Sequence, residues 1–312
     1  MFLMSNAVEC LNVVKRFGDV VALNEFTLSV PKGCIFGLIG PNGAGKTTAI
    51  KICLGLLRPD KGKVSLFDEP PWNNPDVKYK VGVIHERAAF PPHIRVRKYL
   101  EHMSRIYGLG EVRRVREVLK LLGLEEVSER RIGSLSAGTL KKLSIAQAIL
   151  HSPEMVIADE PTANLDPLAR IELLELISRL HKEEGMGFLI SSHILSELEK
   201  ICDMVAFVYA GKVSLAGKLK ELIREFRGLF RVSGSRLDGL VKILKEIPYV
   251  RDVRVRGNDV IARVDEGYGA DFYKDVGLLA KKAGVEIYCI ESRAICIEEL
   301  FRRIALREAQ GA

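Results

Sequence analysis

A glycine-rich octapeptide constrains the fold of this chain more than any other feature of its sequence. Residues 40–47 read Gly-Pro-Asn-Gly-Ala-Gly-Lys-Thr and satisfy the pattern GxxxxGK[ST]. The apolar run Cys34–Ile39 precedes them and is typical of a strand buried on both faces, and residues 46–57 follow with helical spacing. A strand, a glycine loop and a helix in this order begin an α/β unit and indicate a phosphate-binding loop.

This loop has the chemistry that a nucleoside triphosphate requires. Its glycines let backbone N–H groups converge on a phosphate at the positive end of the following helix. Lys46 can neutralise the β and γ oxygens, and the Thr47 hydroxyl can complete the coordination of Mg²⁺. The candidate nucleotide-binding residues of the segment are Gly40, Pro41, Asn42, Gly43, Ala44, Gly45, Lys46, Thr47 and Thr48.

A second buried strand supplies the acidic residues that such a loop needs. The apolar run Met155–Ala158 ends in Asp159 and Glu160. Asp159 at the strand end is placed for Mg²⁺, whereas Glu160 points elsewhere along the pleat and can polarise an attacking water. The sequence therefore predicts separate roles for the two carboxylates, metal binding and general base catalysis.

With these residues in place, the chain resembles the nucleotide-binding subunit of an ABC transporter. Residues 135–139, Leu-Ser-Ala-Gly-Thr, are similar to the family signature LSGGQ, although Ala and Thr replace the family's Gly and Gln. A basic helix and then the second acidic strand follow this segment. The resemblance implies that Ser136 and the backbone of Gly138 contact the γ-phosphate held by an opposite protomer.

The resemblance extends to four further segments. Phe17 matches the aromatic residue that stacks on adenine. The segment Val81–Glu86 aligns with the one that ends in the family's Q-loop glutamine, so its glutamate is a candidate acceptor for the metal's water, although it adds negative charge beside Mg²⁺. Residues 161–166 look like the D-loop, with Asn where Gly is usual, and His193 matches the switch histidine, a candidate catalytic residue.

The order of strand and helix signals predicts two domains. Residues 1–221 combine antiparallel strands over residues 8–30, a helical insertion at about residues 92–150 and a parallel sheet, so the expected fold class is α/β, a P-loop NTPase of ABC type. Residues 222–312 follow the order strand, helix, strand, strand, helix, strand, the split unit of a ferredoxin-like α+β domain. This part resembles the C-terminal extension of type-2 exporter ATPases, including the pattern Ile297–Phe301. Packing alone and a regulatory or dimer-steadying role stay open for it.

The net charge of +7 is concentrated in one segment. Residues 95–120 hold eight Lys or Arg against three Glu. Few aromatic residues interleave with these charges, so we expect no nucleic-acid partner. The open alternatives are a solvated helix surface and a surface that faces anionic lipid or an acidic partner.

Three function classes compete. In the first, two copies or two different ATP-binding subunits sandwich two ATP and drive a separately encoded membrane permease that exports a substrate. The second is a soluble ABC ATPase in an assembly process such as iron–sulfur cluster biogenesis. The third is a nucleotide-gated binding module that hardly hydrolyses, and the presence of both Glu160 and His193 argues against it.

Composition and hydropathy set the expected location. Apolar residues at 47% and charged residues at 28% exclude a disordered, collagen-like or coiled-coil chain. The sequence has no run of ~18 apolar residues of the kind that spans a membrane and no signal-peptide pattern at its N-terminus. We therefore expect a cytoplasmic protein that its permease holds at the inner face of the cell membrane.

Overall fold

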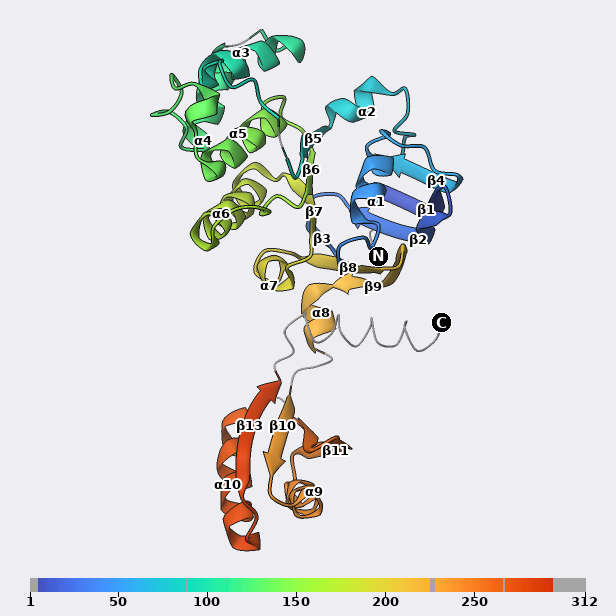
Figure 1. Ribbon diagram of the computed structural model, residues 1–312, viewed down its shortest axis with the longest axis vertical. Coiled ribbons are helices and arrows are strands. Elements are labelled where there is room, and N and C mark those ends of the chain that lie inside the picture. Colours follow the sequence, from blue (N-terminus) through green and yellow to red (C-terminus); the bar gives the residue numbers. More distant parts are fainter. Residues whose placement is uncertain (1–4, 88, 111, 225–227, 266, 294–312) are drawn as a thin grey trace. The chain divides into compact units, whose positions relative to one another are not determined.

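The computed structural model describes residues 5–87, 89–110, 112–224, 228–265 and 267–293. The chain divides into two compact units, Met1–Leu219 and Lys220–Ala312, whereas the boundary expected from the sequence lies at residue 222 (Figure 1). The helix expected over residues 297–309, with the pattern Ile297–Phe301, lies outside the described residues.

The first unit begins with a three-stranded antiparallel sheet. Its strands are β1 (Asn6–Phe17), β2 (Val20–Pro31) and β4 (Lys61–Leu66), in the order β2-β1-β4. The antiparallel pair predicted for residues 8–30 is confirmed, but each strand has 12 residues and is longer than expected. Alternate side chains of β1 and β2, such as Val8 and Phe26, are buried in the core.

A six-stranded sheet forms the centre of the first unit. Its strand order is β5-β6-β7-β3-β8-β9, and these strands are β3 (Ile35–Ile39), β5 (Val81–Ile84), β6 (Met155–Asp159), β7 (Gly187–Ser192), β8 (Met204–Tyr209) and β9 (Lys212–Lys218). The predicted parallel sheet is confirmed for β3, β6, β7 and β8; β5, which was not predicted, joins it in parallel, and β9 returns antiparallel to β8. Strands β3, β6 and β7 are buried throughout, which explains their apolar runs, although β6 ends in Asp159 and β7 in Ser191 and Ser192.

Helices cover the central sheet (Figure 1). They are α1 (Lys46–Cys53), α2 (Pro75–Tyr79), α6 (Pro167–Glu184) and α7 (Leu195–Leu198), while α3 (Val96–Ile106), α4 (Val112–Leu121), the 3-10 turn η1 (Ile132–Ser134) and α5 (Ala137–Ile149) occupy the expected helical insertion. Figure 1 shows α1 on one side of the central strands, and α5 and α6 on the other. Side-chain capping fixes the start of α6, because Asp166 Oδ1 accepts from the backbone N–H groups of Leu168 and Ala169 at 3.1 and 3.0 Å.

The second unit is ferredoxin-like. After α8 (Leu219–Arg224) its elements are β10 (Leu229–Gly234), α9 (Leu237–Glu246), β11 (Val250–Arg256), β12 (Asp259–Val264), α10 (Gly269–Ala283) and β13 (Ile287–Arg293). The predicted order of elements is confirmed, and all pairings in the sheet β11-β12-β10-β13 are antiparallel. Phe230, Leu240 and Phe272 form part of its core. In the described ranges of both units, no helix has the length and hydropathy to cross a bilayer.

Candidate functional site

The loop between β3 and α1 needs glycine where other backbone segments approach it. A Cβ atom on Gly40 would lie 2.3 Å from the carbonyl oxygen of Val208, and one on Gly45 would lie 2.6 Å from that of Ala22. Gly45 also has φ 104°, a conformation that side chains disfavour. The glycines of the motif therefore let the loop lie against β8 and β2 and direct the N-terminus of α1 at the space that the loop encloses.

Lys46 lies inside this loop. Its side chain is 6% exposed, and Nζ donates to the carbonyl oxygens of Gly40 and Pro41 at 2.8 and 3.2 Å. The same ammonium lies 3.2 Å from Oε1 of Glu160. A buried charge requires such partners, so the loop and the acidic strand are joined through one lysine.

The acidic pair at the end of β6 is buried and held by the next strand. The exposed fractions of Asp159 and Glu160 are 8% and 9%. Ser191 on β7 donates its hydroxyl to Asp159 Oδ1 at 2.6 Å and accepts from the Glu160 backbone N–H at 2.9 Å. Glu160 has φ 46°, a left-handed conformation that costs ~1–3 kcal/mol outside glycine and is common at functional sites. Ser191 thus orients the Asp159 carboxylate and holds the backbone of Glu160.

His193 follows β7 and meets the second oxygen of Glu160. Its Nδ1 lies 2.9 Å from Glu160 Oε2. One carboxylate therefore bridges Lys46 and His193. The structure brings the phosphate loop, the acidic strand and the candidate switch histidine together, because β3, β6 and β7 are neighbours in a parallel sheet and their C-terminal ends share one edge.

Of the remaining candidates near the loop, Ala44 is buried and others are accessible. Asn42, Gly43 and Thr47 are exposed, and Thr48 is half-buried in the first turn of α1. Phe17 is 49% exposed at the end of β1, with the Lys15 ammonium 5.6 Å from its ring centroid. Adenine stacking on this ring stays a prediction.

Glu86 is exposed, and its carboxylate pairs with Arg87 and not with a residue of the phosphate loop. Its Oε1 lies 3.7 Å from Nε of Arg87. The Glu86 backbone carbonyl accepts from the buried Lys141 of α5 at 2.7 Å, and burial lowers the pKa of that lysine. The segment after β5 is thus fastened to α5 through its backbone, and a metal role for the Glu86 carboxylate stays a prediction.

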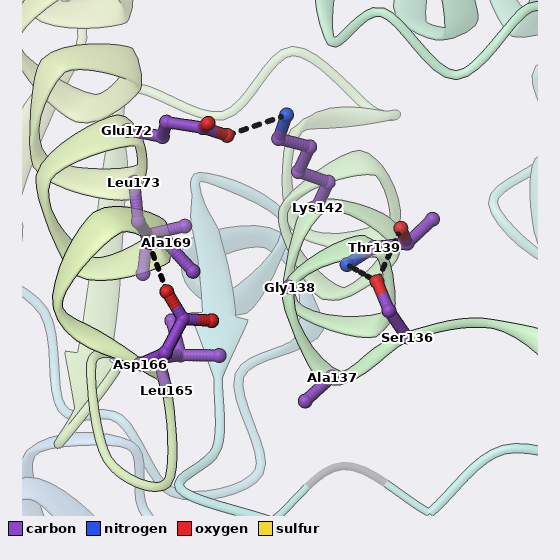
Figure 2. Close-up of a pocket in the computed structure, with 10 residues that line it drawn as sticks. All are labelled: Ser136, Ala137, Gly138, Thr139, Lys142, Leu165, Asp166, Ala169, Glu172 and Leu173. Atoms are coloured by element: carbon purple, nitrogen blue, oxygen red, sulfur yellow. Dashed lines mark hydrogen bonds and ion pairs between the residues drawn. The ribbon is translucent and has the colours of Figure 1, made fainter.

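The signature segment caps α5 beside a separate pocket. Ser136 Oγ accepts from the Thr139 backbone N–H at 3.3 Å and lies 2.9 Å from the Thr139 hydroxyl. Figure 2 shows this pair at one wall of a pocket of about 200 Å³ between α5 and α6. The lining residues are Ser136, Ala137, Gly138, Thr139, Lys142, Leu165, Asp166, Ala169, Glu172 and Leu173. None of them belongs to residues 40–48, so this pocket contains no part of the phosphate loop of its own chain.

Three residues organise the site although the sequence assigned none of them a role in it. Ser191 on β7 and Lys141 on α5 are buried polar side chains, and a buried polar group needs a partner. A polar residue on an element with a mostly buried pattern is the signal in the sequence that could have found them, although it does not distinguish them from neighbours such as Ser192. Glu197 on α7 carries no such signal, since its partners Thr162 and Arg170 lie in other segments.

Comparisons with known proteins agree with this geometry. The family described as ABC transporter matches residues 23–163. The bacitracin transport ATP-binding protein BcrA of Bacillus licheniformis is 36% identical over 67% of this chain and 69% of its own length. The Nod factor export ATP-binding protein I of Rhizobium sp. (strain N33) is 30% identical over 97% of this chain and 98% of its own length.

Solved structures give the same result for the fold. The structure of an ATP-binding subunit of an ABC transporter has a TM-score of 0.63 and 31% identity, covering 70% of this chain and 93% of that chain. A nucleotide-free ATP-binding cassette from an ABC transporter has a TM-score of 0.63 and 27% identity, covering 70% of this chain and 94% of that chain. The relatives favour a transporter ATPase over a soluble assembly ATPase. The chain therefore belongs to the ABC transporter ATP-binding proteins, which hydrolyse ATP to power transport, and it resembles their type-2 exporter branch.

Proposed function

We propose that this chain binds ATP with Mg²⁺ at residues 40–48 and hydrolyses it with Glu160 as the general base. The carrying observation is the Glu160 carboxylate, whose two oxygens lie 3.2 Å from Lys46 Nζ and 2.9 Å from His193 Nδ1. Phosphate oxygens compete with Oε1 for the Lys46 ammonium, so nucleotide binding frees one oxygen toward the attacking water. His193 holds the other oxygen in place.

The residues beside the loop fit Mg²⁺ in kind. The Asp159 carboxylate and the Thr47 hydroxyl offer hard oxygen ligands, which Mg²⁺ takes together with water and phosphate oxygens. Ser191 donates to Asp159 Oδ1 at 2.6 Å and so fixes the plane of that carboxylate. When bound, the ion neutralises charge on the phosphate oxygens. Glu86 remains a candidate acceptor for the water shell of the ion.

A second protomer completes the proposed site. Ser136 and Gly138 line a pocket without any residue of their own phosphate loop. We therefore assign them to the γ-phosphate held by an opposite subunit, in a homodimer or a heterodimer. In this arrangement each nucleotide is bound between the phosphate loop of one chain and the signature segment of the other.

Export through a separately encoded permease is the transport role that we propose. The support is similarity to proteins named for bacitracin transport and Nod factor export. The permease would hold the chain at the inner face of the cell membrane. We assign hydrolysis to residues 1–221 and an accessory role, packing or dimer steadying, to residues 222–312.

ATP turnover tests the proposal. Glu160→Gln keeps the shape of the side chain but removes its basicity, so phosphate release should fall by ~100-fold or more while ATP binding persists. Glu117→Gln is the matched control, because Glu117 on α4 is exposed and pairs with Arg113 at 2.9 Å, and it should turn over like the wild type. Equal turnover in the wild type and Glu160→Gln would contradict the assignment.

A further inference from the structure

Glu197 lies on α7, which follows β7, and it contacts the segment that follows the neighbouring strand β6. Its side chain is 11% exposed. Oε2 accepts from the Thr162 hydroxyl at 2.6 Å, and Oε1 accepts from Nη1 of Arg170 at 3.3 Å. Each carboxylate oxygen therefore has a donor from a different part of the chain, one in the D-loop and one in α6.

The same contacts fasten the D-loop, residues 161–166, along its length. Thr162, near its start, is 2% exposed and bonded to Glu197. Arg170 also donates through Nε to the carbonyl oxygen of Leu165 at 2.9 Å, near the end of the loop. Asn164 between them has φ 63°. One largely buried carboxylate and its arginine thus hold a loop with left-handed backbone in a fixed position.

These contacts lie close to the Glu160–His193 contact, which we assign to catalysis. Glu160 directly precedes the D-loop, and His193 lies just before α7. The two segments touch first at Glu160 and His193, at 2.9 Å, and again at Thr162 and Glu197, at 2.6 Å. The second contact is part-buried and contains neither catalytic candidate. Loss of it would leave the two segments joined by the Glu160–His193 contact and by the pairing of β6 with β7.

We propose that Glu197 is a positioning residue for hydrolysis, which rests on the proposed function of Glu160 and His193. Its carboxylate holds the D-loop against the segment of His193 and so keeps His193 at hydrogen-bond distance from Glu160. The phosphate loop is not part of this network. Loss of the Glu197 carboxylate should therefore lower kcat and leave ATP affinity unchanged.

Kinetics on the full chain separate positioning from a brace for stability alone. In Glu197→Gln we expect kcat to fall about 10- to 100-fold, since small misplacements of reacting groups have such effects, with the Kd for ATP within about twofold of wild type. Glu117→Gln makes the same change in an exposed pair with Arg113 and should leave kcat unchanged. A lower melting temperature with unchanged kcat would overturn the proposal.

Thr162 provides a second test that keeps the carboxylate. Thr162→Val retains the shape of the side chain and removes the donor, whereas Thr162→Ser retains the hydroxyl. We expect Thr162→Val to lower kcat and Thr162→Ser to keep the wild-type kcat. Because Glu197→Leu and Thr162→Val each abolish the Thr162–Glu197 hydrogen bond, Thr162→Val should add little further loss in Glu197→Leu, and fully additive losses would overturn the proposal.

The outcomes also distinguish this inference from the proposed function. If the wild type hydrolyses ATP and Glu160→Gln does not, but Glu197→Gln and Thr162→Val keep the wild-type kcat, only the positioning role is wrong. If Glu160→Gln turns over like the wild type, the proposed function is wrong and the positioning role is lost with it. Should Glu197→Gln fail to fold, the Val and Ser variants of Thr162 decide.

Discussion

The two regions proposed to contact nucleotide differ in how they are held. Around the phosphate loop, Lys46, Asp159 and Glu160 are buried, and their contacts of 2.6 to 3.2 Å cross from one element to another. In the signature region Ser136 is exposed, and its hydrogen bond is made within the first turn of its own helix. The first region is therefore fixed by the fold of one chain, whereas the second is an open surface suited to a partner.

The largest expected difference concerns two lysines. Lys46→Ala should lower ATP affinity roughly 100-fold or more, because bonds to charged groups contribute ~1.5–3 kcal/mol each. Lys142→Ala in the signature region removes a half-exposed ammonium that pairs with Glu172 at 3.3 Å, and such pairs contribute ~1 kcal/mol or less. Binding of ATP to each monomer, measured by calorimetry, checks this. Equal losses would contradict the contrast between the regions.

The second prediction concerns Ser136. Arginine at this exposed position should leave monomer folding and ATP binding intact, but it should weaken the ATP-driven dimer of Glu160→Gln at least about 10-fold, since overpacking costs ~1–3 kcal/mol. Light scattering with and without ATP measures the dimer. If dimerisation depends neither on ATP nor on Ser136→Arg, the signature assignment is wrong.

A smaller effect is expected in the D-loop. Asn164 has φ 63°, which glycine and asparagine tolerate and β-branched residues do not. Asn164→Val should lower the free energy of unfolding by ~1–2 kcal/mol, whereas Asn164→Gly should be close to neutral. Urea denaturation compares the two variants. If both are equally stable, the left-handed backbone is not what selects asparagine here.

The smallest effects are expected on the basic surface of the helical insertion. Four of the basic residues in residues 95–120 are paired, Arg95 and Arg97 with Glu129, and Arg113 and Arg114 with Glu117. This supports the solvated-surface alternative for those four. Exposed Arg105 and Arg116 are the better probes for anionic lipid.

Each alanine substitution at Arg105 or Arg116 should weaken binding to phosphatidylserine vesicles by at most about 1 kcal/mol at low salt. The difference should disappear at high salt, because screening removes it. Co-sedimentation measures the binding. If the wild-type protein does not bind the vesicles at low salt, residues 95–120 form only a solvated helix surface.

Local spacing made much of the fold predictable. The strand, glycine loop and helix of residues 34–57 are neighbours in sequence, and alternation identified the antiparallel pair β1 and β2 but not the length of its strands. The ferredoxin-like order of the second unit followed from the same periodicities. Helix α2, strand β4 and the antiparallel return of β9 were not predicted, since short elements carry too few periods to stand out.

The candidate site was also predictable only in part. By itself the sequence determined the residue types at 40–48, 159 and 160, because glycines, a lysine and carboxylates at fixed spacing are required by phosphate and metal chemistry. Only the tertiary structure decided which side chains hold them. Ser191 contacts Asp159 across 32 residues, and Glu197 contacts Thr162 across 35. Such contacts depend on β6 and β7 lying side by side in the sheet, and no spacing along the chain encodes that neighbourhood.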